Sequence, residues 1–431
     1  MARRIIQLTA HDALDRAWLQ RNPVHAAKHL DNLRCKGVRL LEKYPIRVQS
    51  THRALSEHGA RRVRASKPTF AVLASIDDLE AERRLAHDSR DSVIGIFADL
   101  PIAPATPPYC DAAAVGSASD VGNLIRSASF VDNDATGRGV DIAVVDVGVD
   151  GTKVPVRAGW SPPGVDYRIG SANSLDQGDA HGTMCAFDAR LGAPDADILD
   201  YALLRATDNT LQIFLSDALA AFADLIDRRE ANPDRPLVVT NSWQVFDRSS
   251  DAPVGDPANY SANLNHPVCQ QITALLATGA DVLFCAGNCG LPCPVDGCLQ
   301  DGTGPGKSIL GANAHPDVIT IAAVTLNGTR LGYSAQGPGA ITTRKPDVAG
   351  YAQFSADVAY PIHIGTSAAC PVVAGIVAAL RSTPKGAALS PAALKGVLQQ
   401  TATNPAHVWT ADLGYGIISP GAALEAILRT P

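Results

Sequence analysis

Three polar residues that lie far apart in the chain, Asp146, His181 and Ser367, have the side chains needed for acyl transfer. A serine hydroxyl is a weak nucleophile at neutral pH and needs an adjacent base. Imidazole can accept the hydroxyl proton and later deliver it to the leaving group. A carboxylate fixes the tautomer of that imidazole and stabilises its protonated form. If the fold brings them together, these side chains predict a hydrolase that works through a covalent acyl-enzyme.

Ser367 directly precedes a long apolar segment, residues 368–380, which is rich in alanine. This composition predicts a helix that starts near Ser367, is apolar on all sides and is therefore buried. Pro371 is expected in the first turn, where its missing N–H is tolerated. The backbone N–H groups at the start of such a helix can stabilise an oxyanion. Alternatively, Ser367 serves only as the N-cap of the helix.

The other polar residues also have purely structural interpretations. Asp146 could cap the turn that follows its strand, and His181 could be a hydrogen-bonded interior histidine. Asn288, which lies between Gly287 and Cys289, could occupy a left-handed turn position. The catalytic hypothesis therefore depends on all of these residues meeting at one place.

Apolar strand-like runs alternate with helical segments over the second part of the chain. This order predicts a mostly parallel sheet with helices on both faces, an α/β fold whose ligands bind at the carboxyl ends of the strands. Asp146 and Asn288 fall at such ends, as does the segment around Ser242. The expected strands are 140–146, 196–201, 237–243, 281–287 and 318–324, and the expected helices include 211–228 and 270–278.

Four motifs, in this order, resemble those of the subtilisin-like serine proteases (subtilases). They are the segment Gly139-Val-Asp-Ile-Ala-Val-Val-Asp-Val-Gly-Val-Asp, then His181-Gly-Thr, Cys285-Ala-Gly-Asn288 and Gly365-Thr-Ser-Ala-Ala-Cys-Pro. The resemblance covers roughly residues 118–428. It implies a subtilisin-like fold and a serine endopeptidase with the triad Asp146, His181 and Ser367.

The same resemblance implies an oxyanion hole formed by the side-chain amide of Asn288 and the backbone N–H of Ser367. It also implies that the backbone of Ser242, Trp243 and Gln244, with Gly287 nearby, pairs with an extended peptide substrate. The family usually has glycine where Gln244 stands, so a side chain there is expected to narrow the substrate pocket. Alternatively, Trp243 serves only the core.

No cofactor is implied for catalysis and no metal is assigned to the active site, although structural calcium is common in the family. The sequence contains no acidic loop that fixes a calcium site. Four cysteines lie close to Asn288. Their spacing is compatible with three alternatives, namely free thiols, disulfides or a metal site. They are Cys285, Cys289, Cys293 and Cys298.

The N-terminal quarter of the chain is expected to form separate units. Residues 1–44 are interpreted as a helical, basic extension, residues 105–117 as a linker and residues 118–431 as the catalytic domain. Residues 45–104 have the order βαββαβ, with strands near 44–49, 63–66, 70–75 and 92–98 and helices near 51–58 and 76–87. This pattern resembles the prodomain of many subtilases, which implies an intramolecular inhibitor and cleavage between residues 101 and 117.

Charge is unevenly distributed between these units. Residues 1–100 contain 18 Lys and Arg against 12 Asp and Glu, whereas the remaining residues contain 19 against 31. A basic N-terminal module is therefore expected to dock on an acidic body. The small cluster Arg61-Arg62-x-Arg64 lacks neighbouring aromatic residues, which disfavours a nucleic-acid partner. No apolar run has the character of a signal peptide or a membrane span, so a cytoplasmic location without membrane association is the expectation.

Two other functions share part of this pattern. A non-catalytic peptide-binding scaffold could retain the fold, and an esterase or a peptide ligase could use the same triad. Labelling by a fluorophosphonate would distinguish the first from an enzyme. The sequence alone does not distinguish a protease from an esterase or a peptide ligase.

Overall fold

The computed structural model describes most of the chain. Two expected elements, the helix near residues 51–58 and the strand near residues 63–66, lie outside this part, as does most of the expected linker. The described residues are 1–33, 35–41, 45–49, 68–104, 113–126, 128–162, 167–171, 180–203, 206–207, 210–211, 213–404 and 408–429.

A seven-stranded sheet forms the centre of the larger domain, and every neighbouring pair of its strands is parallel. The strand order is β17-β16-β15-β13-β7-β9-β8, so β7, which ends at Asp146, lies inside the sheet. The strands are β7 (Asp141–Asp146), β8 (Val156–Trp160), β9 (Asp197–Ala202), β13 (Leu237–Asn241), β15 (Asp281–Cys285), β16 (Ile319–Val324) and β17 (Val348–Tyr351).

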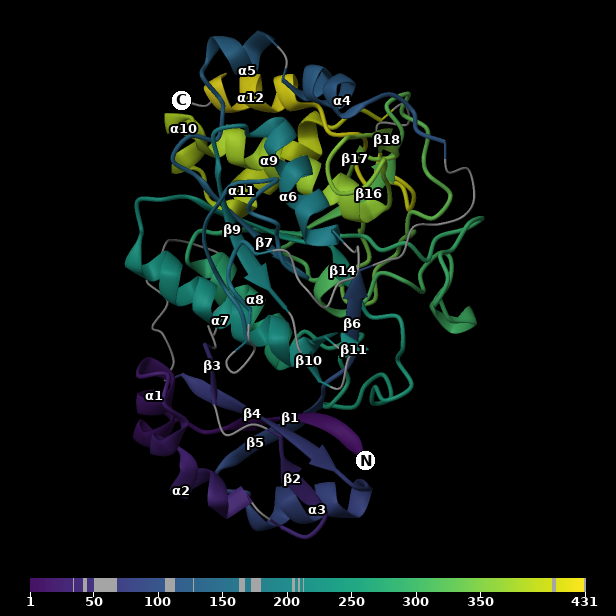
Figure 1. Ribbon diagram of the computed structural model, residues 1–431. Coiled ribbons are helices and arrows are strands. Elements are labelled where there is room, and N and C mark those ends of the chain that lie inside the picture. The colour runs from purple at the N-terminus through teal and green to yellow at the C-terminus, as the bar shows by residue number, and fades with distance from the viewer. Residues whose placement is uncertain are drawn as a thin grey trace.

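Alternate residues of β7 face two separate cores, as the period of a strand requires. Ile142 and Val144 belong to the core that contains α6 (His181–Gly192) and α9 (Thr366–Arg381). Ala143 and Val145 belong to the core that contains α7 (Leu215–Ala231) and α8 (Pro267–Ala277). Figure 1 shows these two pairs of helices on opposite faces of the sheet. The expected mostly parallel sheet with helices on both faces is confirmed.

The remaining helices of the larger domain pack on α6, on α9 or on one another (Figure 1). They are α4 (Ala118–Ile125), α5 (Ala128–Asp132), α10 (Pro384–Ala388), α11 (Pro391–Thr401) and α12 (Pro420–Arg429). Short strands complete the loops: β10 (Ala206–Thr207), β11 (Thr210–Leu211), β18 (Phe354–Ser355) and β19 (Ile362–His363). Within the described residues, every helix is too short or too polar to cross a lipid bilayer.

The expected strand at 237–243 is interrupted, and this differs from the sequence-based prediction. β13 ends at Asn241, and Trp243 and Gln244 form a separate strand, β14, that leaves the parallel sheet. β14 pairs antiparallel with β6 (Pro101–Pro104), which also pairs with β12 (Ile213–Phe214). The expected helix from residue 211 therefore starts only at Leu215, because the residues just before it belong to β12.

The N-terminal residues form an antiparallel sheet with the strand order β2-β4-β1-β5, and β3 also pairs with β4. Its strands are β1 (Ala2–Leu8), β2 (Val38–Leu40), β3 (Ile46–Val48), β4 (Thr69–Ile76) and β5 (Val93–Ala98). Helices α1 (Asp12–Leu19), α2 (Ala27–Leu30) and α3 (Leu79–Asp88) accompany the sheet.

The interpretation of residues 1–44 as a helical extension is wrong for its first part. β1 lies between β4 and β5, and Ile5, Ile6 and Leu8 are fully buried there. A strand fits because β1 gains hydrogen-bonded neighbours on both edges, which a separate helix in the same place would not have. The N-terminal module therefore begins at Ala2 rather than at residue 45.

The module docks on α7 and α8, below them in Figure 1. Its cations meet acidic residues of α7: Arg21 pairs with Asp224 at 2.8 Å and Arg47 approaches Asp227 at 3.6 Å. The Trp18 indole N–H also donates to Asp227, at 2.9 Å. The attraction expected from the uneven charge distribution thus has specific partners at this interface.

Candidate active site

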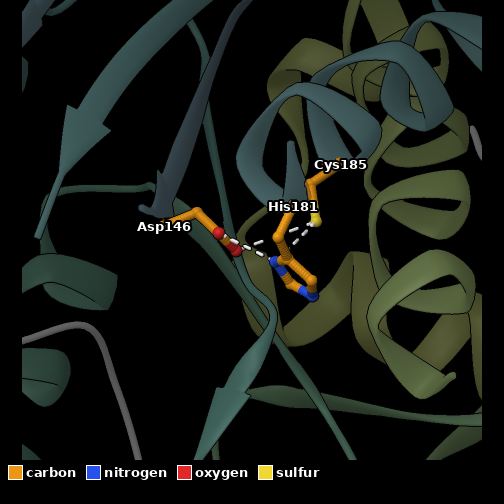
Figure 2. A group of neighbouring side chains, drawn as sticks. All are labelled: Asp146, His181 and Cys185. Atoms are coloured by element: carbon orange, nitrogen blue, oxygen red, sulfur yellow. Dashed lines mark hydrogen bonds and ion pairs between the residues drawn. The ribbon is translucent and has the colours of Figure 1, made fainter. Parts of the chain in front are cut away.

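Asp146 and His181 form a buried hydrogen-bonded pair. Asp146 is the last residue of β7, and His181 is the first residue of α6. Nδ1 of His181 lies 2.8 Å from Oδ1 of Asp146, and both side chains are almost completely buried. Because the carboxylate can only accept, Nδ1 carries the proton. Figure 2 shows that the second ring nitrogen of His181 points away from Asp146.

A close backbone approach permits this pairing. The start of α6 passes over the turn after β7, and a Cβ on Gly182 would lie only 2.2 Å from the carbonyl oxygen of Gly148. Any larger residue would push His181 away from Asp146. The close approach therefore explains, on steric grounds, why glycine follows His181 in the sequence motif.

Cys185 lies one helical turn after His181 and joins the same cluster (Figure 2). Its Sγ lies 3.8 Å from His181 Nδ1, 3.7 Å from Asp146 Oδ2 and 3.5 Å from the carbonyl oxygen of Ser367. Its spacing of four residues from His181 puts both side chains on one helix face. The thiol physically links the acid–base pair to the serine.

Asp146, His181 and Cys185 are also the kind of side chains that bind metal ions, with ligand atoms within 4.8 Å of one another. A metal ligand must be a thiolate, however. Burial and the Asp146 carboxylate raise the pKa of Cys185 well above its usual value, which disfavours the thiolate. The hydrogen bonds account for the cluster, and a structural calcium ion elsewhere stays a prediction.

Ser367 is the second residue of α9, which begins at Thr366 after the N-cap Gly365. Its hydroxyl donates to the carbonyl oxygen of Ser242 at 3.3 Å. In return, the Ser242 hydroxyl donates to the carbonyl oxygen of Ser367 at 3.1 Å. Ser242 is thus directly at the site, between the end of β13 and the start of β14.

The expectation that Pro371 lies in the first turn of α9 is wrong, because Pro371 lies inside the helix. Proline has no N–H to donate to the carbonyl group four residues earlier, which belongs to Ser367. That carbonyl accepts hydrogen bonds from Ser242 and Cys185 instead. The internal proline therefore allows the backbone of the serine to be held by residues outside α9.

Asn288 follows β15, and its side chain is anchored through its oxygen. Oδ1 accepts hydrogen bonds from the backbone N–H and the hydroxyl of Thr366, at 2.9 and 2.8 Å. Nδ2 is buried without a hydrogen-bond partner among the described residues. It lies 2.8 Å from the position that a Cβ would take on Gly365, just before Ser367. The amide thus offers an unused donor beside the serine.

The alternative interpretation of Asn288 as a left-handed turn residue is wrong. Among the described residues, positive φ angles in this turn belong to Gly287, at 101°, and not to Asn288. Gly287 also needs to be small, because a Cβ there would lie 2.1 Å from Oε1 of Gln244. The turn geometry is thus provided by the glycine, which leaves the asparagine side chain available.

Trp243 and Gln244 have different surroundings although they are neighbours in β14. The Trp243 indole packs edge-to-face on Phe284, with ring centroids 5.1 Å apart, so its side chain belongs to the core. The Trp243 backbone pairs with Pro104 of β6. Gln244 pairs with Ala103, and its side chain turns toward the segment that carries Asn288.

The cysteines near Asn288 are divided between two states. Cys289 and Cys298 form a disulfide, whereas Cys285 is a buried free thiol. Cys293 is also disulfide-bonded. Of the alternatives left open by the sequence, a metal site is therefore wrong for Cys289 and Cys298. Their disulfide braces the loop directly after Asn288.

A family model described as the Subtilase family matches residues 137–416. The chain belongs to the subtilase family. It is therefore a subtilisin-like serine protease that acts on protein or peptide substrates, and the family needs no cofactor for catalysis. The expectations for family, fold class and enzyme class are confirmed.

Two characterised relatives illustrate the range of this family. Mycosin-1 of Mycolicibacterium smegmatis is 28% identical over 325 residues, which cover 67% of this chain and 69% of the relative. Serine protease AprX of Bacillus subtilis is 25% identical over 239 residues, covering 49% of this chain and 46% of the relative.

Two solved structures share the fold of this subtilase. Fervidolysin from Fervidobacterium pennivorans, a keratinolytic enzyme related to subtilisin, matches with a TM-score of 0.60 at 17% identity. The match covers 98% of this chain, including the N-terminal module, and 61% of fervidolysin. MycP1 from the ESX-1 type VII secretion system matches with a TM-score of 0.50 at 20% identity, covering 75% of this chain and 89% of MycP1.

Proposed function

We propose that this subtilase is an endopeptidase in which Ser367 is the nucleophile, His181 the general base and acid, and Asp146 the residue that orients His181. The strongest support is the position of Cys185 Sγ, which contacts the His181–Asp146 pair and the Ser367 carbonyl. One sulfur atom can contact all three residues only if they meet at one point of the sheet edge.

The proposed reaction follows from the protonation of His181. Since Nδ1 donates to Asp146, the other nitrogen, Nε2, is the basic one and can accept the Ser367 proton. The hydroxyl now donates to the Ser242 carbonyl at 3.3 Å, so it must rotate toward His181 when substrate binds. Attack on the peptide carbonyl gives a tetrahedral intermediate, and His181 then protonates the leaving amine.

Two donors are available for the negative charge of that intermediate. Nδ2 of Asn288 has no partner among the described residues and is fixed through its own oxygen by Thr366. The Ser367 N–H belongs to the first turn of α9, where N–H groups lack partners within the helix. A pre-oriented donor of this kind typically contributes about 10²–10³ to kcat.

Covalent labelling tests this assignment directly. A fluorescent fluorophosphonate should label the wild type, and labelling should be lost in Ser367→Ala while the circular dichroism spectrum is unchanged. Hydrolysis of labelled casein should be lost in parallel. Equal labelling of the wild type and Ser367→Ala would overturn the role of Ser367, and no labelling of either would favour the non-catalytic scaffold.

We further propose that the N-terminal module inhibits the enzyme by placing its end in the substrate site. β6 follows the module directly and pairs antiparallel with β14 on one side and β12 on the other. Chain direction supports the idea, since β6 runs from the residue opposite Gln244 to the residue opposite Trp243, and Ser242 follows. A substrate in the same register would have its next residue opposite Ser242, beside Ser367.

This register predicts the processing site. The residue after Pro104 is Ala105, so cleavage is expected between Ala105 and Thr106, within the 101–117 segment. Intact-mass analysis of the purified wild type should give a fragment that begins at Thr106, and Ser367→Ala should remain full length. A wild-type chain that stays intact during active casein hydrolysis would contradict processing but not the protease assignment.

A further inference from the structure

The side chain of Gln244 bridges the two segments that flank the proposed reaction point. Its Oε1 accepts a hydrogen bond from the Asn288 backbone N–H at 2.8 Å, and its Nε2 lies 3.1 Å from Sγ of Cys289. We propose that Gln244 closes the pocket for the substrate residue whose carbonyl is attacked, so that only glycine or alanine fits well there. This inference rests on the proposed function.

Three contacts define where that substrate residue must lie. Its carbonyl carbon has to reach the Ser367 hydroxyl, which is 3.3 Å from the Ser242 carbonyl oxygen. Its carbonyl oxygen has to reach Nδ2 of Asn288. If a substrate continues the register of β6 by one residue beyond Trp243, its backbone lies opposite Ser242. The residue is therefore held between the 242–244 segment and the 287–289 segment.

Gln244 occupies the space between those same two segments. The side chain is almost completely buried, with 4% of its surface exposed. Its Oε1 lies so close to the opposite segment that a Cβ on Gly287 would be 2.1 Å away. A large substrate side chain that entered between the segments would have to displace Gln244, whereas a hydrogen atom or a methyl group would not.

Several contacts keep Gln244 from moving aside. If the side chain rotated outward, the buried Asn288 N–H would lose its acceptor. Cys289 is held by its disulfide to Cys298, so the far segment cannot readily retreat. Gln244 therefore acts as a fixed wall rather than as a lid.

The chain's own sequence agrees with a small residue at this position. The residue that follows Pro104 in the sequence is an alanine, Ala105, in the order Ile102-Ala103-Pro104-Ala105. The sequence of the proposed processing segment is therefore consistent with a pocket that accepts a methyl group.

Peptide substrates that copy this segment test the proposal. The protein is expressed from the full sequence and, as purified, is assayed with succinyl-Ile-Ala-Pro-Xaa-p-nitroanilide, in which Xaa is Gly, Ala, Leu or Phe. The ratio of kcat/KM values for two peptides does not depend on how much enzyme the module inhibits. We expect the wild type to prefer Ala over Phe by about 100-fold or more, and Gln244→Gly to reduce that ratio to about fivefold or less.

A matched variant distinguishes the effect of the volume of the Gln244 side chain from the effect of its hydrogen bonds. Gln244→Met has a side chain of similar length without the amide, so it should slow all the peptides but keep the wild-type preference for Ala. A wild type that cleaves the Phe and Ala peptides equally well would overturn the proposal. So would a ratio that is the same in Gln244→Gly as in the wild type.

Active-site titration with the fluorophosphonate distinguishes a failed role of Gln244 from a failed catalytic assignment. Labelled wild type without selectivity for small residues overturns only the role of Gln244. Unlabelled wild type overturns the proposed catalytic function, and the inference with it. Labelling of each variant also confirms that its active site is folded, so a changed ratio cannot come from misfolding.

Discussion

Thr366 holds the side chain of Asn288 by two hydrogen bonds to one oxygen atom, at 2.9 Å from its N–H and 2.8 Å from its hydroxyl. Because both bonds go to Oδ1, the amide nitrogen is directed away from them, and it has no partner among the described residues. Thr366 thus orients the amide nitrogen of Asn288, which is the expected oxyanion donor. We therefore expect substitutions of Asn288 and of Thr366 to lower kcat by different amounts.

Asn288→Ala should lower kcat by about 10²–10³ with little change in KM, because its amide is needed mainly in the transition state. Thr366→Val removes one of the two bonds to Oδ1 and should lower kcat by about tenfold. Thr366→Ser keeps the hydroxyl and should restore most of the activity. Steady-state kinetics on one peptide check the series, and an unchanged kcat in Asn288→Ala would contradict the assigned oxyanion donor.

Asp146→Asn should lower kcat/KM by about 10⁴ while leaving the fold intact. An amide can donate to Nδ1 of His181, which would move the ring proton to Nε2 and remove the basic nitrogen. Thermal unfolding monitored by circular dichroism serves as the control for folding. Activity within tenfold of the wild type would show that His181 does not depend on Asp146 for its tautomer.

Asp99 connects the N-terminal module to the start of α7, and its removal should relieve inhibition. Its carboxylate accepts from the Ser216 N–H and hydroxyl at 2.9 and 3.0 Å, and from Arg3 at 2.6 Å. Asp99→Ala leaves these donors unpaired at the interface, which typically weakens an association by tenfold or more. The initial rate of peptide hydrolysis by the protein expressed from the full sequence should therefore rise.

Glu80→Ala is the matched control, since Glu80 pairs with Arg84 inside the module, on α3. That variant should have the initial rate of the wild type. If Asp99→Ala and Glu80→Ala give equal rates, the module does not act as an inhibitor through this contact.

The same interface predicts a loss of stability in acid. Nε2 of His266 lies 2.9 Å from the Ala98 carbonyl oxygen, at the end of β5, and burial lowers the pKa of His266 to about 4. The unfolded chain binds this proton near pH 6.5, so between pH 6.5 and 4 unfolding takes up a proton. The contribution of His266 to the free energy of unfolding is therefore fully present above pH 6.5. It decreases by about 3 kcal/mol as the pH falls toward 4.

Urea unfolding at pH 7, 5.5 and 4.5 measures this effect. His266→Gln keeps a donor for the Ala98 carbonyl but cannot titrate, so its free energy of unfolding should depend less on pH. The same pH dependence in both proteins would assign the acid sensitivity to other groups.

The Cys289–Cys298 disulfide should support both stability and turnover. It joins two cysteines at a sequence separation of 9 next to Asn288, and Cys289 also contacts Gln244. Cys289→Ser with Cys298→Ser should lower the free energy of unfolding by about 2–3 kcal/mol and reduce kcat, because the loop directly after the oxyanion donor is loosened. A double variant with wild-type kcat and lower Tm would limit the disulfide to a structural role.

Much of the fold was predictable because its signals are local. The buried strands that end at Asp146 and before Asn288, and the apolar helix that begins near Ser367, follow from composition and period alone. The strand β1 was not predictable in this way. Its partners β4 and β5 lie more than 60 residues away in the chain, and a strand is stabilised mainly by the neighbours it pairs with.

The sequence by itself determined which groups are present and in what order: the carboxylate, imidazole, amide and hydroxyl. Only the tertiary structure decided how they meet. Pro371 frees the Ser367 carbonyl for Ser242, Cys185 links the serine to His181, and Gln244 fills the space beside Gly287. These contacts join residues far apart in the chain, and their distances depend on how helices pack on the sheet, which no local pattern of residues specifies.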